Sequence, residues 1–232
     1  MHFLVQRMTN AFLDLIFPDF CLLCDGKLPY DETDFCLSCA SMLPLRPDIN
    51  MTLSTPDEIF LDNSWSFFDF DKNIQSLIHR LKYSQRERLG VRLSQLGLDS
   101  LKDIIKNNPI DMILPIPLHS RKFRERGYNQ VDKMGKFLAQ ELGAKFSPKL
   151  VKRQKDTSTQ TKLNREERKN NMKSAFRVPN VRRIKDASIL LVDDVLTTGA
   201  TANACARILK NEGAKKVSLL TLATPQQKTI IQ

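Results

Sequence analysis

An apolar run that ends in two acidic residues constrains the fold of this 232-residue chain more than any other feature. Residues 189–192 are all aliphatic, and Asp193 and Asp194 follow them directly. A run of this kind is typical of a strand that is buried on both faces of a parallel sheet. The polar loop after it and a helix from about Ala200 complete a strand–loop–helix unit, and open α/β sheets bind their ligands at such turns. We therefore expect an α/β fold with a ligand site just after this strand.

The loop after the strand suits a phosphorylated sugar. Gly199 lets the backbone approach a ligand, and the N–H groups that begin the next helix can bind an anion. Asp193 and Asp194 can accept hydrogen bonds from a vicinal diol or bind a magnesium-bound sugar, so the pattern indicates ribose 5-phosphate. The alternative is a buried strand whose aspartates only cap the helix, although one aspartate would suffice for that. The candidate binding residues are Asp193, Asp194, Val195, Leu196, Thr197, Thr198, Gly199, Ala200 and Thr201.

This stretch resembles the binding signature of the type I phosphoribosyltransferases, which combines four apolar residues, two acids and a Thr-Gly-x-Thr loop. The resemblance implies a parallel-sheet core with helices on both faces, and a site for phosphoribosyl pyrophosphate (PRPP) with Mg²⁺. In that fold a short loop contacts the pyrophosphate, and Lys82 and Tyr83 stand where such a loop is expected. Asp193, Asp194 and Lys82 are accordingly the candidate catalytic residues, although no general base stands out.

Four cysteines near the N-terminus form two Cys-x-x-Cys pairs, Cys21 with Cys24 and Cys36 with Cys39, separated by eleven residues. This spacing can place four thiolates around one tetrahedral metal. The alternative is two disulfides in a secreted miniature domain, which is less expected because residues 1–17 lack a signal-peptide pattern. We predict a structural zinc site that has no open position for metal catalysis. Cys205 stands apart and is expected to be a small buried residue.

The sequence divides into three parts. Residues 1–45 are expected to hold an amphipathic helix and the zinc module, residues 46–63 a linker, and residues 64–232 the phosphoribosyltransferase-like domain. No run of eighteen apolar residues is present, so no membrane span is expected. Within the third part, apolar periodicity predicts strands at 65–70, 111–116 and 217–222, and helices at 72–82, 91–105 and 128–142, the last closed by Gly143.

The net charge of +10 favours polyanionic partners, either phosphorylated metabolites or nucleic acid. Basic residues concentrate in a predicted loop at 118–130 and in the region 145–185, where residues 154–164 predict a long loop. The long loop can be a ligand lid or a strip for a nucleic-acid backbone, and bulk charge does not separate these. The loop at 118–130 can reach the ligand phosphates or be a solvated basic loop. The candidate residues for DNA or pyrophosphate are Arg121, Arg124, Arg126, Asn129, Gln160, Lys162, Arg165, Arg168 and Lys169.

In this order, the motifs resemble those of the ComF (ComFC) family of competence-associated, phosphoribosyltransferase-like proteins. The resemblance rests on the four-cysteine module, Lys82-Tyr83, Pro115-Ile116-Pro117, Arg126-Gly127-Tyr128-Asn129-Gln130, Gln160-x-x-Leu163-x4-Arg168-x2-Asn171-x4-Phe176 and Asp193 to Thr201. Family members often have glycine where this chain has Gln85.

The ComF resemblance implies a PRPP-binding protein that handles incoming single-stranded DNA during natural transformation. It also implies a cytoplasmic place beside a DNA-translocating helicase and a recombination-mediator protein. The alternative is an active phosphoribosyltransferase that acts on an unidentified base or nucleotide without binding DNA directly. A PRPP-sensing regulator is a third possibility, but the sequence contains nothing like a helix-turn-helix.

Overall fold

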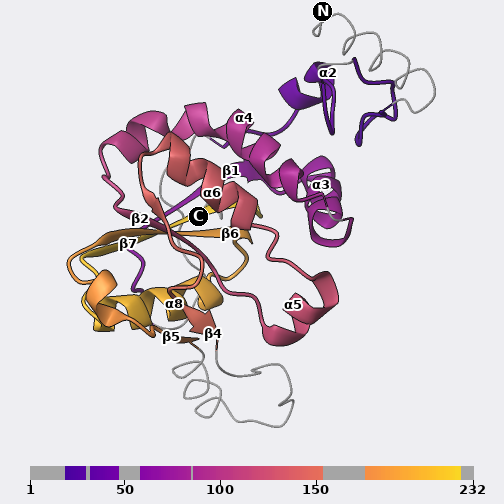
Figure 1. The fold of residues 1–232 in the computed structure, drawn as a ribbon. Helices are drawn as coiled ribbons and strands as arrows, with labels where there is room; N and C mark the ends of the chain where they lie inside the picture. Colours follow the sequence, from indigo (N-terminus) through magenta and orange to yellow (C-terminus); the bar gives the residue numbers. More distant parts are fainter. Residues whose placement is uncertain (1–18, 30–31, 47–57, 85, 154–175, 226–232) are drawn as a thin grey trace, which may run out of the picture.

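The computed structural model describes residues 19–29, 32–46, 58–84, 86–153 and 176–225. At its centre is a five-stranded sheet with the order β1-β7-β6-β2-β3, in which every neighbouring pair is parallel. This architecture confirms the expected parallel-sheet core (Figure 1). The strands are β1 (Asn63–Asp69), β7 (Lys216–Thr224), β6 (Ser188–Val195), β2 (Met112–Pro115) and β3 (Lys145–Phe146).

Helices cover both faces of the sheet, as expected from the uninterrupted apolar character of β6. Leu190 and Val192 belong to a core that includes residues of the helices on one face, whereas Ile189 and Leu191 belong to the core under α8 on the other. Alternate residues of a strand point to opposite faces, so every residue of such a strand must be apolar. The first face carries α3 (Lys72–Tyr83), α4 (Glu87–Lys106) and α6 (Asp132–Glu141), and the second carries α8 (Ala200–Asn211).

The basic segment at 118–130 is not a simple loop. It contains a short helix, α5 (Ser120–Arg126), that the sequence pattern did not predict because the segment has no apolar face. His119 caps its N-terminus by accepting a hydrogen bond from the N–H of Arg121, and Gly127 ends it in the left-handed conformation, with φ +78°. The helix predicted at 128–142 begins only at Asp132, although it does end before Gly143, whose φ is +64°. The helix predicted at 91–105 begins earlier, at Glu87.

The described segments on either side of residues 154–175 pair with each other. β4 (Lys152–Arg153) and β5 (Phe176–Arg177) form a two-stranded antiparallel sheet, and the 3₁₀ turn η1 (Val181–Arg183) follows before β6. Residues 154–175 lie outside the described residues. The candidates Gln160, Lys162, Arg165, Arg168 and Lys169 therefore stay predictions from sequence, as does the expected N-terminal helix at 1–17.

The cysteine module packs against the main domain instead of standing apart from it. Its helix is α2 (Leu37–Ser41), and its apolar residues Leu22, Phe35 and Leu43 join the same core as residues of β1 and α4. Leu45 forms an antiparallel bridge with Phe68 on the outer edge of β1. The module thus covers an edge of the sheet that would otherwise expose unpaired backbone groups.

The described end of the predicted linker is also packed. Asn203 of α8 accepts a hydrogen bond from the N–H of Phe60 at 2.7 Å and donates to the carbonyl of Glu58 at 2.7 Å. Leu61 is buried in the core under α8. Over the part of the chain that the structure describes, no helix combines the length and apolar character needed to cross a bilayer.

Candidate functional site

The strand order creates a crevice at the carboxyl ends of β2 and β6. After β2 the chain moves outward to β3, whereas after β6 it moves in the opposite direction to β7. Open α/β sheets bind ligands where the chain changes direction in this way, because the two connections diverge and leave a gap. Asp193 and Asp194 lie at this end of β6, and Ile116 continues β2 beside them through a hydrogen bond to the carbonyl of Val192.

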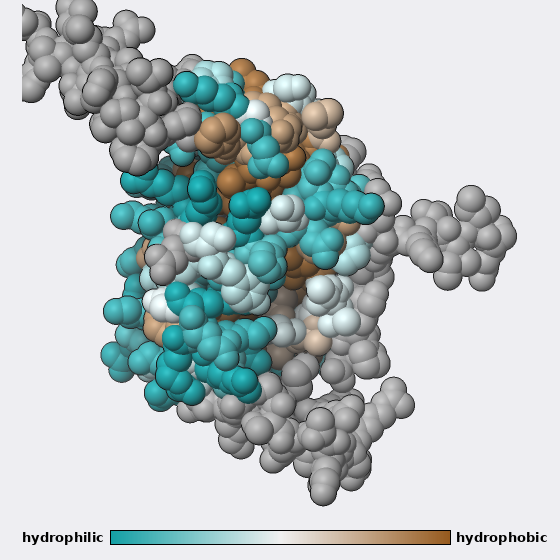
Figure 2. Space-filling model, turned by 90° about the vertical axis from the view of Figure 1, so that its right-hand side faces the viewer, coloured by the Kyte–Doolittle hydropathy of each residue, from teal (hydrophilic) through white to brown (hydrophobic). Residues whose placement is uncertain are grey.

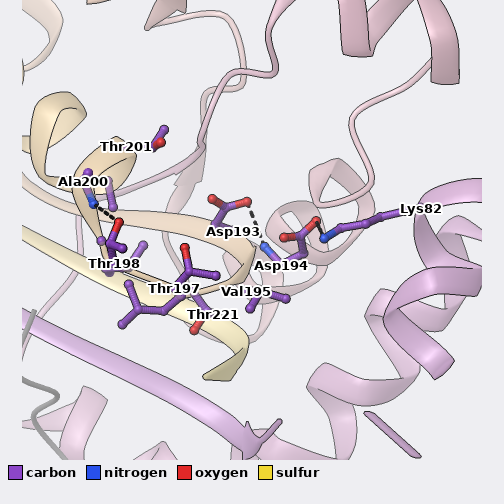
Figure 3. Close-up of a pocket in the computed structure, with 13 residues that line it drawn as sticks. Lys82, Asp193, Asp194, Val195, Thr197, Thr198, Ala200, Thr201 and Thr221 are labelled. Atoms are coloured by element: carbon purple, nitrogen blue, oxygen red, sulfur yellow. Dashed lines mark hydrogen bonds and ion pairs between the residues drawn. The ribbon is translucent and has the colours of Figure 1, made fainter. Parts of the chain in front are cut away.

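A cavity of about 230 Å³ opens at the end of β6. Figure 3 shows the two aspartates side by side, with Asp194 turned toward Lys82 and the Thr197–Thr201 loop beyond Asp193. The structure thus brings Lys82, which precedes the aspartates by more than a hundred residues, to the predicted ribose site. The cavity is lined by Lys82, Asp193, Asp194, Val195, Leu196, Thr197, Thr198, Gly199, Ala200, Thr201, Ala202, Leu219 and Thr221.

The threonine loop forms a site that suits an anion. Gly199 is the N-cap of α8 and has φ +77°, a conformation that glycine adopts without strain. Thr198 Oγ1 accepts a hydrogen bond from the N–H of Ala200 at 3.4 Å, which holds the loop against the helix end. The first N–H groups of an α-helix have no partner within the helix, and the helix dipole adds positive potential there. These groups can bind a phosphate in the cavity.

The two aspartates differ in their surroundings. Asp194 is buried, and its Oδ2 lies 3.1 Å from Lys82 Nζ and accepts a hydrogen bond from Gln130 Nε2. Asp193 Oδ1 accepts from the N–H of Asp194 at 2.9 Å. Burial and the neighbouring charge of Asp194 raise the pKa of Asp193 to about 7, and the N–H of Asp194 and the charges of Lys82 and Lys122 oppose this rise without cancelling it. Asp193 is therefore a carboxyl group that changes charge near neutral pH.

Tyr83 follows Lys82 at the end of α3 and reaches toward α5. Its ring is exposed, and the Arg126 guanidinium carbon lies 5.1 Å from the ring centroid, within the range of a cation–π contact. Arg126 Nη1 also donates to Gln130 Oε1 at 2.9 Å. The end of α3 and the end of α5 are thus in contact, and each is linked to Asp194, the first through Lys82 and the second through Gln130.

The other basic candidates of this segment lie in different surroundings. Arg121 and Arg124 are exposed on α5, and Arg121 Nε donates to Glu125 at 3.0 Å. Asn129 is buried, and its Nδ2 donates to the carbonyl of Ile116 at 3.1 Å. Its Oδ1 has no hydrogen-bond partner among the described residues. Of these candidates, Arg126 is linked to Asp194 through its hydrogen bond with Gln130.

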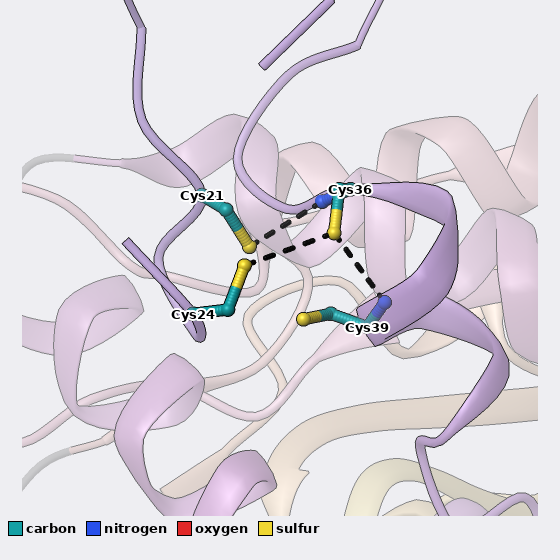
Figure 4. A group of neighbouring side chains, drawn as sticks. All are labelled: Cys21, Cys24, Cys36 and Cys39. Atoms are coloured by element: carbon teal, nitrogen blue, oxygen red, sulfur yellow. Dashed lines mark hydrogen bonds between the residues drawn. The ribbon is translucent and has the colours of Figure 1, made fainter. Parts of the chain in front are cut away.

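The four cysteines of the N-terminal module converge, as Figure 4 shows. Their sulfur atoms all lie within 4.8 Å of one another. Two backbone N–H groups donate to sulfur atoms, each with an N–Sγ distance of 3.5 Å. The N–H of Cys36 donates to Cys21 Sγ, and the N–H of Cys39 donates to Cys36 Sγ. Such N–H···S contacts stabilise thiolates and orient them as ligands.

This cluster fits one zinc ion. Zn–S bonds of ~2.3 Å in a tetrahedron place the sulfurs about 3.8 Å apart, and Cys24 Sγ and Cys36 Sγ are 4.0 Å apart. Burial of Cys21 raises the pKa of its thiol, but hydrogen bonds from the backbone N–H groups of Cys36, Cys24 and Leu23 and from the Cys24 thiol outweigh this and lower the pKa to about 6. A thiol with so low a pKa is ready to bind metal at neutral pH.

The chain matches a known protein family and several proteins of known name. The family described as "Phosphoribosyl transferase domain" matches residues 133–230. The "DNA utilization protein YhgH" of Salmonella typhi is 32% identical over 160 residues, which span 68% of this chain and 70% of that protein. "Competence protein F" of Haemophilus influenzae is 32% identical over 152 residues, 63% of this chain and 66% of that protein. The chain belongs to the ComF family.

Among solved structures, an adenine phosphoribosyltransferase resembles this ComF-family chain with a TM-score of 0.37 and 20% sequence identity, covering 61% of this chain and 73% of that one. At so low a score, the fold assignment rests on the sheet and on the family match instead. Both support the predicted phosphoribosyltransferase fold.

Four residues near the site of this ComF-family chain were absent from the candidates predicted by sequence: Ala202, Leu219, Thr221 and Gln130. Leu219 and Thr221 of β7 line the cavity because their strand lies beside β6. Gln130 bonds to Asp194 across 64 residues of sequence. Gln130 does stand in the motif shared with the ComF family, but no local pattern indicates a partner so distant in the chain.

Proposed function

We propose that this ComF-family protein binds a phosphoribosyl ligand, PRPP or a close relative, in the cavity at the end of β6. The observation that carries the proposal is the pair of adjacent carboxylates beside the threonine loop at the N-terminus of α8. Carboxylates accept hydrogen bonds from ribose hydroxyls, and helix N–H groups with threonine hydroxyls bind a phosphate. A ligand that carries both groups on one sugar satisfies both halves of the cavity.

Each part of the cavity then has a role. The loop from Thr197 to Thr201 holds the 5-phosphate, and Asp193 and Asp194 hold the ribose hydroxyls. Lys82 faces the pyrophosphate, so it leaves its ion pair with Asp194 when the ligand arrives. Tyr83 follows Lys82 but is not among the residues that line the cavity. Mg²⁺, when bound with the ligand, neutralises charge on the pyrophosphate.

Calorimetric titration with PRPP and Mg²⁺ tests this role. We expect the double variant Asp193→Asn, Asp194→Asn to lose binding while it keeps its fold, measured by circular dichroism. The matched control replaces Asp99 and Asp103 by asparagine, because these exposed carboxylates on α4 lie away from the cavity lining and their loss changes the net charge equally. Equal affinity in the two double variants would refute the assignment.

We further propose that the protein handles incoming single-stranded DNA in natural competence, a role that the names of its relatives suggest. The supporting observation is α5, which is strongly basic and carries a half-exposed Phe123 close to the exposed Tyr83–Arg126 pair. Hydrophilic side chains predominate on the face that Figure 2 shows, which looks onto the side of the molecule that carries α3 and α5. Basic groups that track a backbone and aromatic rings that stack bases are the usual means of binding single strands without sequence preference.

Salt-dependent binding of single-stranded DNA tests this second role. Each phosphate contact contributes a slope of about −0.7 to the log–log dependence of affinity on salt. Replacing Arg121 and Arg124 by glutamine should therefore weaken binding and flatten the slope, and we expect the same for Arg165, Arg168 and Lys169. A wild-type slope in both variants would favour the alternative, an active phosphoribosyltransferase without direct DNA binding. Release of pyrophosphate from PRPP in the presence of candidate bases would identify that enzyme.

A further inference from the structure

The buried amide of Gln130 lies between the carboxylate of Asp194 and the basic helix α5. Gln130 is 2% exposed and both ends of its side chain are engaged. Its Nε2 donates to Asp194 Oδ2, and its Oε1 accepts from Arg126 Nη1 at 2.9 Å. The orientation of the amide is fixed by chemistry, because a carboxylate only accepts hydrogen bonds and a guanidinium only donates them.

The contacts continue from Gln130 to the surface. The guanidinium of Arg126 lies over the ring of Tyr83, and its Nη2 is 3.5 Å from the Tyr83 hydroxyl. A continuous set of contacts therefore joins an exposed aromatic ring to a buried carboxylate. Lys82 and Gln130 both contact Oδ2 of Asp194, so neither of them occupies Oδ1.

We propose that Gln130 is a positioning residue through which a DNA strand on α5 weakens the binding of the phosphoribosyl ligand, and the ligand weakens the binding of the strand. The inference rests on the proposed function, because it needs both ligands to bind. A phosphate attracts the Arg126 guanidinium more strongly than the neutral oxygen of Gln130 does. When Arg126 turns to the strand, Gln130 Oε1 stays buried without a donor, which is unfavourable. The amide then shifts, and Asp194 loses the contact that orients it for the ribose.

Linkage makes the effect reciprocal and measurable. If the strand lowers affinity for the ligand by some factor, the ligand lowers affinity for the strand by the same factor. Typical couplings between sites span about 5-fold to 150-fold, and we expect at least about fivefold here. Direct repulsion between two anionic ligands adds to the effect, but salt screens it and it does not depend on Gln130.

The test compares PRPP affinity, with Mg²⁺, in the presence and absence of saturating single-stranded oligothymidylate. In Gln130→Met the side chain keeps a similar shape but can neither donate nor accept, so affinity for PRPP falls and the oligothymidylate changes it by less than about twofold. Arg126→Gln should behave likewise and does not alter a buried residue. Arg124→Gln removes the same charge from the same helix, so it should weaken binding of the strand, but at saturating strand it should keep the wild-type coupling.

The possible results separate the inference from the proposed function. Loss of coupling in Gln130→Met and Arg126→Gln, with coupling retained in Arg124→Gln, supports the inference. If Gln130→Met does not fold, the two arginine variants decide. Binding of both ligands with the same coupling factor in every variant overturns the inference alone. Failure of wild-type protein to bind PRPP or the oligothymidylate overturns the proposed function, and the inference with it.

Discussion

Replacing Asp193 by asparagine should stabilise the folded protein above neutral pH even though it removes an acceptor for the ligand. Burial, assisted by the charge of Asp194, raises the pKa of Asp193 from 3.8 to about 7 in the folded protein. Between these two values the folded state holds a proton that the unfolded state has released. The tighter proton binding of folded Asp193 therefore stabilises the fold fully below about pH 4. The free energy of unfolding then falls as the pH rises from about 4 to about 7.

The magnitude follows from the pKa. One pKa unit corresponds to about 1.4 kcal/mol, so charging Asp193 in the folded protein costs up to about 4 kcal/mol. The side chain keeps some contact with solvent in the cavity, which reduces the cost, and we expect about 2 kcal/mol. Asparagine carries no charge at any of these pH values, so the variant does not lose this stability as the pH rises.

Urea unfolding without magnesium or ligand measures the difference at about pH 4 and about pH 8. We expect Asp193→Asn to be about as stable as wild type at the lower pH and more stable by about 2 kcal/mol at the higher one. Asp186→Asn is the control for loss of one exposed carboxylate. A stability difference between Asp193→Asn and wild type that does not change with pH would refute the reasoning.

Two further predictions concern the module and the packing of α4. Metal analysis of purified protein should find one zinc per chain, held by Cys21, Cys24, Cys36 and Cys39 as thiolates. Chelation of the zinc should lower the melting temperature, because the module shares its core with β1. A zinc content well under one per chain, with disulfides present, would contradict this. Gly97→Ala should destabilise the fold by about 1–3 kcal/mol, because its new Cβ would lie 2.4 Å from carbons of Phe67, and thermal unfolding measures this. Gly90→Ala, on the same helix with no neighbour nearer than 3.6 Å, should instead be neutral or stabilising by up to ~1 kcal/mol; equal effects of the two changes would contradict the packing.

The sheet and its main helices were predictable because their signals are local. The apolar runs within β2, β6 and β7 appear directly in the sequence, since strands covered on both faces are largely apolar. The cysteine spacing predicted the convergence of four sulfurs for a similar reason, because each Cys-x-x-Cys pair forms within one turn.

The basic segment and its contacts could not be predicted in this way. α5 has no buried residue, so hydrophobic periodicity gives no signal, and its ends depend on the cap at His119 and the turn at Gly127. The late start of α6 reflects long-range contacts, since Tyr128 donates to the carbonyl of Leu81 and Gln130 to Asp194. Such contacts depend on the folded arrangement of several elements.

A crystal structure of the protein with PRPP and Mg²⁺ tests the central claim most directly. We predict the 5-phosphate at the N-terminus of α8, about 2.7–3.2 Å from the N–H groups of the Thr197–Thr201 loop, with the ribose hydroxyls on Asp193 and Asp194. Lys82 should have turned from Asp194 to the pyrophosphate. A ligand held only by the arginines of α5, with the cavity at β6 empty, would contradict the account.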